Sequence, residues 1–265
     1  MAASRRRPLL TLLQARFPDT SKDELYARIL CGEVKLSDGV CRDPKQPVAE
    51  DAELEMSGRL YVSRGGEKLA SAQAAWDFPI AGKIFVDAGA STGGFTDFLL
   101  QHGARAVHAV DVGYNQLDYK LRKDSRVFNH ERTNILHIEA LDPQPEAAVG
   151  DLSFRSLRRA AAHTLRITRE GWGIFLLKPQ FELAGSEGEF DGVVSDPGLL
   201  EAVVLATLED LAAEGLLPEA IIPAGIKGRK GNQEYLLRLR RSDSSADGIP
   251  PAPAELCAGL FGSRD

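Results

Sequence analysis

Short apolar runs alternate with amphipathic stretches along the chain from residue 69 to about residue 240. The apolar runs have the length of strands, and the stretches between them repeat apolar residues at helical spacing. The pattern predicts strands at residues 83–87, 106–112, 126–131, 147–152, 173–178, 220–223 and 234–239. It predicts helices at residues 93–102, 116–122, 156–167 and 197–214. The alternation predicts an α/β fold with a Rossmann-like, seven-stranded, mainly parallel sheet and helices on both faces.

A smaller α/β module is predicted before this sheet, over residues 1–57. Leucines at helical spacing between Leu9 and Leu13 predict one helix, and a second helix follows through Cys31. Residues 33–36 are predicted to form a strand that leads into a short hairpin. The rest of the chain is divided into a linker, a main domain and a flexible tail rich in Ser, Asp, Pro and Gly, at residues 58–67, 68–241 and 242–265.

Composition limits the class of protein. The 265 residues are 43% hydrophobic, which excludes a largely disordered chain, and the net charge of −6 means that nucleic-acid binding would need a local basic surface. No stretch approaches the roughly 20 apolar residues that span a bilayer. The odd, scattered cysteines favour reduced thiols over disulfides or a zinc site. We expect a cytoplasmic protein without metal or membrane contact; the basic start of the chain leaves a targeting peptide open.

A glycine-rich turn joins the first predicted strand of the sheet to the helix after it. Asp87 ends the strand, and the turn residues that could contact a ligand are Gly89, Ser91, Thr92, Gly93, Gly94 and Phe95. Glycines allow close approach of the backbone to a ligand, and free N–H groups of the helix suit a carboxylate. Asp111 ends the second strand, where an acidic side chain can bind the ribose hydroxyls of an adenosine. Ser91 replaces the second glycine of a dinucleotide site, which leaves less room for a pyrophosphate.

Four polar residues beyond the turn are candidates for chemistry. Asp151 and Lys178 end the fourth and fifth predicted strands. Glu234 begins the last strand, and Lys68 follows two glycines. A parallel sheet could bring these side chains to one end of the strands. Each also has an ordinary interpretation: Asp151 as a helix cap, and the others as surface charges or an exposed strand end.

Six segments of the chain are specific in combination: YVSRGGEKL (61–69), DAGASTGGFTD (87–97), VDVGY (110–114), DLSF (151–154), KPQFE (178–182) and GRKGNQE (228–234). With them the chain resembles the hemolysin-A-type (TlyA-like) ribosomal RNA 2′-O-methyltransferases. That family joins an S4-type RNA-binding domain to an FtsJ-type methyltransferase domain. The resemblance covers residues 8–240.

The resemblance implies an S-adenosylmethionine-dependent enzyme that methylates a ribose 2′-hydroxyl, of a cytidine, in ribosomal RNA. The family's catalytic Lys-Asp-Lys-Glu set falls on Lys68, Asp151, Lys178 and Glu234. Lys178 is the candidate base, because its strand is very apolar and Lys68 would add like-charge repulsion. Asp151 and Glu234 would orient the two amines. Asn134 and Asp151 are further candidate contacts for the cofactor, and no metal is required.

Basic residues gather in two parts of the sequence that could bind RNA. The candidates near the start and the linker are Arg6, Arg7, Arg59 and Arg64. The candidates near the end are Lys227, Arg229 and Lys230, followed by Arg238, Arg240 and Arg241. Phosphate contacts supply much of the affinity for nucleic acid and need only a local patch. A solvated charged loop is the ordinary interpretation of the second group.

Three other functions compete with this interpretation. A membrane-active hemolysin would leak liposomes, but no spanning segment or large basic amphipathic helix supports it. An RNA-binding protein that retains the cofactor fold without turnover would not need the four polar residues. A nicotinamide-dependent oxidoreductase would need the missing fingerprint glycine.

Overall fold

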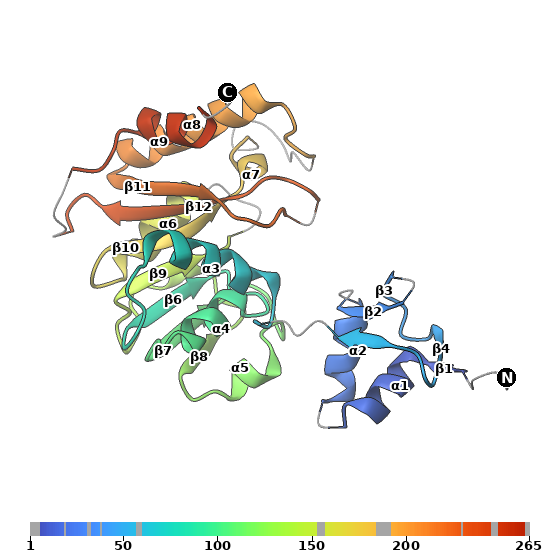
Figure 1. Ribbon diagram of the computed structural model, residues 1–265. Helices are drawn as coiled ribbons and strands as arrows, with labels where there is room; N and C mark the ends of the chain where they lie inside the picture. Colours follow the sequence, from blue (N-terminus) through green and yellow to red (C-terminus); the bar gives the residue numbers. More distant parts are fainter. Residues whose placement is uncertain are drawn as a thin grey trace. The chain divides into compact units, whose positions relative to one another are not determined.

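A seven-stranded sheet forms the centre of the larger part of the chain (Figure 1). Its strands are β6 (Ile84–Ala88), β7 (Ala106–Val110), β8 (Val127–His130), β9 (Ala147–Gly150), β10 (Trp172–Leu177), β11 (Leu216–Pro223) and β12 (Tyr235–Arg241). The order is β11-β12-β10-β9-β6-β7-β8. The strands from β10 to β8 are parallel, and β12 is antiparallel to both of its neighbours. The predicted mainly parallel, seven-stranded sheet is confirmed.

Helices cover both faces of this sheet because successive residues of its strands point to opposite sides. Phe85 belongs to the apolar cluster beneath α3 and α4, whereas Val86 belongs to the cluster beneath α6 and α8. The helices after the first unit are α3 (Arg64–Trp76), α4 (Gly94–Gln101), α5 (Tyr119–Lys123), α6 (Leu157–Arg166), α7 (Pro179–Leu183), α8 (Pro197–Ala213) and α9 (Pro253–Phe261). No helix in the described part of the chain is long and apolar enough to cross a membrane.

The structure, a computed structural model, divides into two units, Met1–Leu60 and Tyr61–Asp265. It describes residues 6–18, 20–30, 33–37, 39–56, 60–152, 157–183, 192–228, 230–244 and 249–262. The first unit contains α1 (Leu9–Arg16), α2 (Lys22–Leu30), β1 (Arg6–Pro8), β2 (Val34–Leu36), β3 (Gly39–Cys41), β4 (Pro47–Ala49) and β5 (Leu54–Met56). β1 pairs with β4, and β2 lies between β3 and β5. The unit is a small α/β module with its own core, which includes the fully buried Leu9, Leu13, Leu25 and Ile29.

Two predicted segments differ from the structure. The predicted linker over residues 58–67 contains the start of α3, because Ser63 caps this helix and accepts a hydrogen bond from Gly65 N. The predicted flexible tail contains α9, whose Cys257 is buried and donates to the carbonyl of Glu201 on α8. The tail's average composition concealed apolar residues at helical spacing, which pack on α8 and β11.

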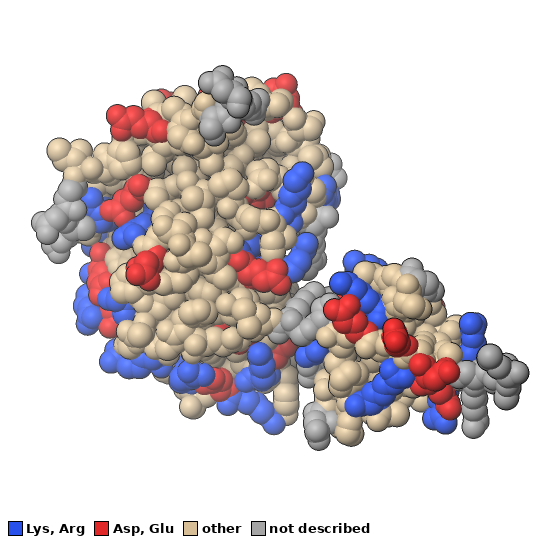
Figure 2. All heavy atoms as spheres, viewed as in Figure 1, with Lys and Arg blue, Asp and Glu red and all other residues tan. Residues whose placement is uncertain are grey.

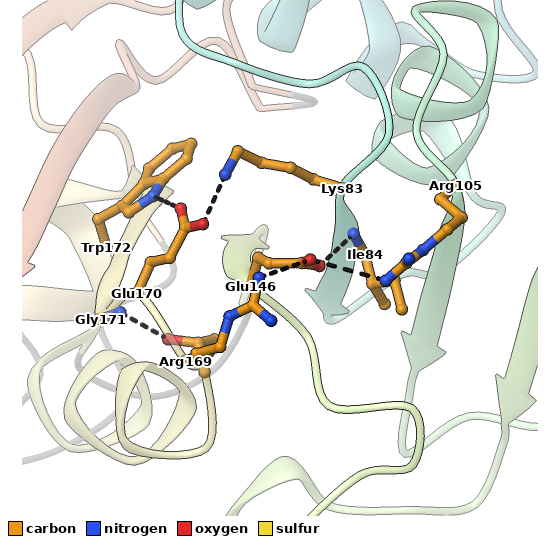
Figure 3. Close-up of polar contacts among 9 residues, drawn as sticks. Lys83, Ile84, Arg105, Glu146, Arg169, Glu170, Gly171 and Trp172 are labelled. Atoms are coloured by element: carbon orange, nitrogen blue, oxygen red, sulfur yellow. Dashed lines mark hydrogen bonds and ion pairs between the residues drawn. The ribbon is translucent and has the colours of Figure 1, made fainter.

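Two glutamates fasten the amino ends of the parallel strands, opposite the ends where ligands bind in such folds (Figure 3). Glu146 accepts hydrogen bonds from Ile84 N at 2.6 Å and from Arg169 Nη2 at 2.9 Å. Glu170 forms an ion pair of 2.6 Å with Lys83 Nζ. Residues just before β6, β9 and β10 are therefore tied together, which fixes the relative positions of these three strands.

Candidate active site

The glycine-rich turn between β6 and α4 follows the predicted path. Gly89 and Gly93 have φ angles of +81° and +91°, a region that L side chains rarely adopt. A Cβ atom at Gly89 would lie 2.6 Å from the carbonyl oxygen of Asp151. Only glycine therefore allows the turn to reach the end of the neighbouring strand β9.

Asp87 closes this turn from below. Its Oδ2 accepts hydrogen bonds from Thr96 N at 3.0 Å and from Thr96 Oγ1 at 2.7 Å. Burial raises the pKa of Asp87 to about 7, and the nearby charges of Asp151 and Asp111 raise it further. Its Oδ1 is buried and has no hydrogen-bond partner among the described residues. A buried carboxylate oxygen of this kind fits a ligand that carries donors or positive charge.

Asp111 lies at the opposite side of the turn, directly after β7. Its carboxylate accepts hydrogen bonds from Ser91 N at 2.8 Å and from Gly113 N at 2.6 Å. These bonds fix the carboxylate beside the turn while leaving acceptor capacity, because a carboxylate offers about four lone-pair positions. Two diol hydroxyls, such as those of a ribose, would donate to such a group.

Two buried lysine–carboxylate pairs lie beside the turn. Lys68 Nζ is 2.5 Å from Glu234 Oε2, and Lys178 Nζ is 2.5 Å from Asp151 Oδ1. Both lysines and Glu234 are at least nine-tenths buried. The predicted juxtaposition of these four residues is therefore what the structure shows, while their chemical roles stay predictions.

Strand register explains why residues far apart in sequence meet here. Leu177 pairs with Tyr235 across β10 and β12, so Lys178 and Glu234 follow at neighbouring positions. Phe175 pairs with Gly150, which places Asp151 beside the same strand end. Lys68 arrives from α3, one turn after the Ser63 cap. The site thus runs along the carboxyl ends of β10, β9, β6 and β7.

The remaining predicted cofactor residues occupy different positions in the turn. Ser91 and Thr92 are exposed on it, and Gly93 and Gly94 are buried beneath it. The side chain of Phe95 is packed in the core. Asn134 caps a short 3₁₀ turn, Ile135–His137, by accepting a hydrogen bond from Leu136 N at 3.0 Å. The structure describes no metal-binding group of three or more His, Cys, Asp or Glu residues in the ranges given above.

Three polar residues near the site were not singled out from the sequence. Asp97, in the first turn of α4, accepts a hydrogen bond from Val62 N at 2.8 Å, and Glu182 accepts one from Leu157 N at 2.7 Å. Asn232 bonds to the backbone of a distant segment. All three lie inside the motif segments, which was the available signal. Their partners are backbone groups, which no sequence pattern identifies.

The predicted RNA-binding residues are distributed unevenly. Arg6 and Arg64 are exposed, whereas Arg7 forms an ion pair with Glu50. Lys227 and Lys230 are exposed in the loop between β11 and β12, which ends at Glu234. Arg59 and Arg229 lie outside the described residues.

The basic cluster over residues 225–241 is not continuous. Arg238 and Arg240 both pair with Glu219 on β11, at 3.0 Å and 2.6 Å, and Arg241 pairs with Asp243 at 3.1 Å. These arginines are on the strand β12 itself, so their charges are matched within the sheet. On the face shown in Figure 2, Lys and Arg side chains lie at several separate places, many beside Asp or Glu. Any phosphate contact from this segment therefore falls to its loop.

The fold and the site define an α/β protein with a nucleoside-binding turn and two lysine–carboxylate pairs at one end of its sheet. The model of the FtsJ-like methyltransferase family matches residues 61–241. The chain belongs to this family. The match covers the whole sheet and all four residues of the two pairs.

Named relatives agree with this assignment. A Mycobacterium tuberculosis protein named 16S/23S rRNA (cytidine-2′-O)-methyltransferase TlyA is 37% identical, over 85% of this chain and 87% of its own. A Brachyspira hyodysenteriae protein named Hemolysin A is 41% identical, over 66% of this chain and 75% of its own. A solved structure titled "Putative hemolysin from Streptococcus thermophilus" is 33% identical, with a TM-score of 0.70, and the match covers 97% of this chain and 96% of the other.

Proposed function

We propose that this protein transfers a methyl group from S-adenosylmethionine to a ribose 2′-hydroxyl of a cytidine in ribosomal RNA. The observation that carries the proposal is the pair of buried ion pairs, Lys68–Glu234 and Lys178–Asp151, directly beside the glycine-rich turn. Two lysines held at a nucleoside-binding turn suit the activation of a weak hydroxyl nucleophile. The relative named as a cytidine-2′-O-methyltransferase supports the choice of acceptor.

S-adenosylmethionine suits the residues of the turn. When bound, it supplies an electrophilic methyl group on a positively charged sulfur. Asp111 would accept hydrogen bonds from its ribose hydroxyls, and the unbonded Oδ1 of Asp87 would face its positively charged end. The N–H groups at the start of α4 would receive its carboxylate.

The side chains of this protein would then position the acceptor and move one proton. Methyl transfer requires the acceptor oxygen, the methyl carbon and the sulfur to lie in line, so orientation supplies much of the rate. Lys178, in its amine form, would take the proton from the 2′-hydroxyl as the oxygen–carbon bond forms. Asp151 fixes Lys178 Nζ, and Glu234 fixes Lys68 Nζ beside it.

The substitution Lys178→Ala tests this assignment. Turnover with ribosomal subunits should fall by a factor of about 100 or more, the usual contribution of a positioned acid or base. Binding of S-adenosylmethionine, measured by calorimetry, should be largely kept because the turn is built by β6 and β7. The control Lys123→Ala removes an exposed lysine on α5 and should change neither quantity. Full turnover in Lys178→Ala would contradict the role of this residue.

A further inference from the structure

Asn232 is a buried amide in the loop between β11 and β12, with 3% of its surface exposed. Its Oδ1 accepts a hydrogen bond from Val194 N at 2.9 Å, and its Nδ2 donates to the carbonyl of Gly192 at 3.1 Å. One side chain therefore satisfies both a donor and an acceptor of a segment 40 residues away in sequence. The two bonds hold the loop against the chain that leads into α8.

The same loop surrounds the carboxylate of Glu234. Gly228 N donates to the carbonyl of Asn232 at 2.9 Å, and Gly231 N donates to the carbonyl of Gly228 at 2.9 Å. A Cβ atom at Gly228 would clash with Glu234 Oε1, so the carboxylate lies directly against the loop backbone. Its other oxygen, Oε2, binds Lys68 Nζ. The position of the ion pair therefore depends on the conformation of this loop.

The loop has little stiffness of its own. Gly225 and Gly231 have φ angles of +70° and +95°, and glycine loses more conformational freedom on ordering than any other residue. Side-chain bonds from a buried residue are a direct way to restrict such a segment. Asn232 is two residues before Glu234 and provides this restriction.

We propose that Asn232 is a positioning residue that holds Glu234, and through it Lys68, in the geometry that methyl transfer requires. The inference rests on the proposed function, because it assigns the source of order in that site. It separates two properties of the loop: the exposed Lys227 and Lys230 contact solvent, while Asn232 fixes the buried side of the same segment.

Steady-state kinetics of the full-length Asn232→Ala variant test the proposal. The kcat for ribosomal subunits should fall about tenfold or more, because small misplacements of reacting groups cost up to about 100-fold. The Kd for S-adenosylmethionine should stay within about twofold of wild type, since the turn is built by other strands. The Asn232→Asp variant keeps the bond from Val194 N and loses the donor to Gly192, so its kcat should be intermediate. This second variant also tests the proposal if Asn232→Ala does not fold.

A double-mutant cycle with Glu234→Ala distinguishes positioning from general stabilisation. If Asn232 acts through Glu234, the double variant should have the kcat of Glu234→Ala alone. Thr168→Val is the matched control, because Thr168 is 2% exposed and its hydroxyl bridges the carbonyl of Leu165 and the N–H of Gly171 at the amino ends of the strands. It should lower the melting temperature without lowering kcat.

Two results would overturn the inference while the proposed function stands: wild-type kcat in Asn232→Ala, or losses from Asn232→Ala and Glu234→Ala that multiply in the double variant. If wild-type protein transfers no methyl group to ribosomal RNA, the proposed function fails, and the inference fails with it.

Discussion

Asp87 combines two properties that make its protonation state important to ligand binding. It is 1% exposed, and burial raises its pKa to about 7, so much of it is protonated at neutral pH and below. A protonated carboxyl attracts a positively charged ligand less than a carboxylate does. Binding of such a ligand should therefore favour the ionised form of Asp87.

Affinity for S-adenosylmethionine should increase as the pH rises through 7. If only the ionised form of Asp87 binds well, the Kd at pH 6 should be about tenfold higher than at pH 8. Calorimetric titrations between pH 6 and pH 8 measure this change. Asp87→Asn is the isosteric control, and it should bind more weakly with a Kd that changes little over the range. A constant Kd for wild-type protein would contradict the role given to Asp87.

Individual site residues were predictable to the extent that their position depends on strand ends. Asp151 and Lys178 end apolar runs, and parallel strands place such ends together. Asp111 follows the same rule. Asn232 was not predictable, because its partners are the backbone groups of Gly192 and Val194, and no sequence pattern marks them.

The amino ends of β6, β9 and β10 are stabilised separately from the site. Glu146 is 6% exposed and receives the N–H of Ile84 as well as Arg169. Removing its carboxylate would leave a buried N–H without a partner, which costs about 1–3 kcal/mol. The opposite ends of the strands carry the candidate active site, so the two functions of the sheet occupy different ends.

Glu146→Ala should lower the free energy of unfolding by about 2–3 kcal/mol. Glu146→Gln keeps an oxygen for the N–H of Ile84 and should lower it by less, about 1 kcal/mol. Urea unfolding at pH 7 measures both values. Methyl transfer by the folded Gln variant should equal that of wild type, and a large loss of kcat in that variant would contradict the separation of the two ends.

Most elements of the sheet unit followed from apolar periodicity, because each strand is a short buried run between turn residues. α7 (Pro179–Leu183) was not predicted, because five residues are too few to show a helical period. α9 was concealed by the Ser- and Pro-rich composition around it. The start of α3 was missed because two glycines, at 65 and 66, are unusual in a helix. Tyr61 packs against Gly66, which is the tertiary reason for one of them.

The whole molecule has a net charge of −6, so its interaction with RNA depends on where basic residues lie. Several arginines of β12 are matched by Glu219 and Asp243. Lys227 and Lys230 extend from the loop that ends at Glu234 and are exposed. The S4-type nature of residues 1–57 stays a prediction, and so does its contribution to RNA binding.

The double substitution Lys227→Gln with Lys230→Gln should weaken binding to ribosomal RNA several-fold. Each lost phosphate contact should also reduce the salt dependence of binding, by about one unit in the slope of log K against log salt. Filter binding at several salt concentrations measures both effects. Arg126→Gln is the control, because Arg126 is partly exposed and already paired with Asp124 at 2.6 Å. Equal slopes for wild type and the double variant would exclude this loop as an RNA contact.

The central claim is that the two lysine–carboxylate pairs direct a methyl group to a ribose oxygen. The most direct measurement incubates purified ribosomal subunits with labelled S-adenosylmethionine and the protein, and then locates the label in the RNA by mass spectrometry. The account predicts label on the 2′-oxygen of a cytidine with wild-type protein and almost none with Lys178→Ala. Label on a base, or equal labelling by both proteins, would contradict it.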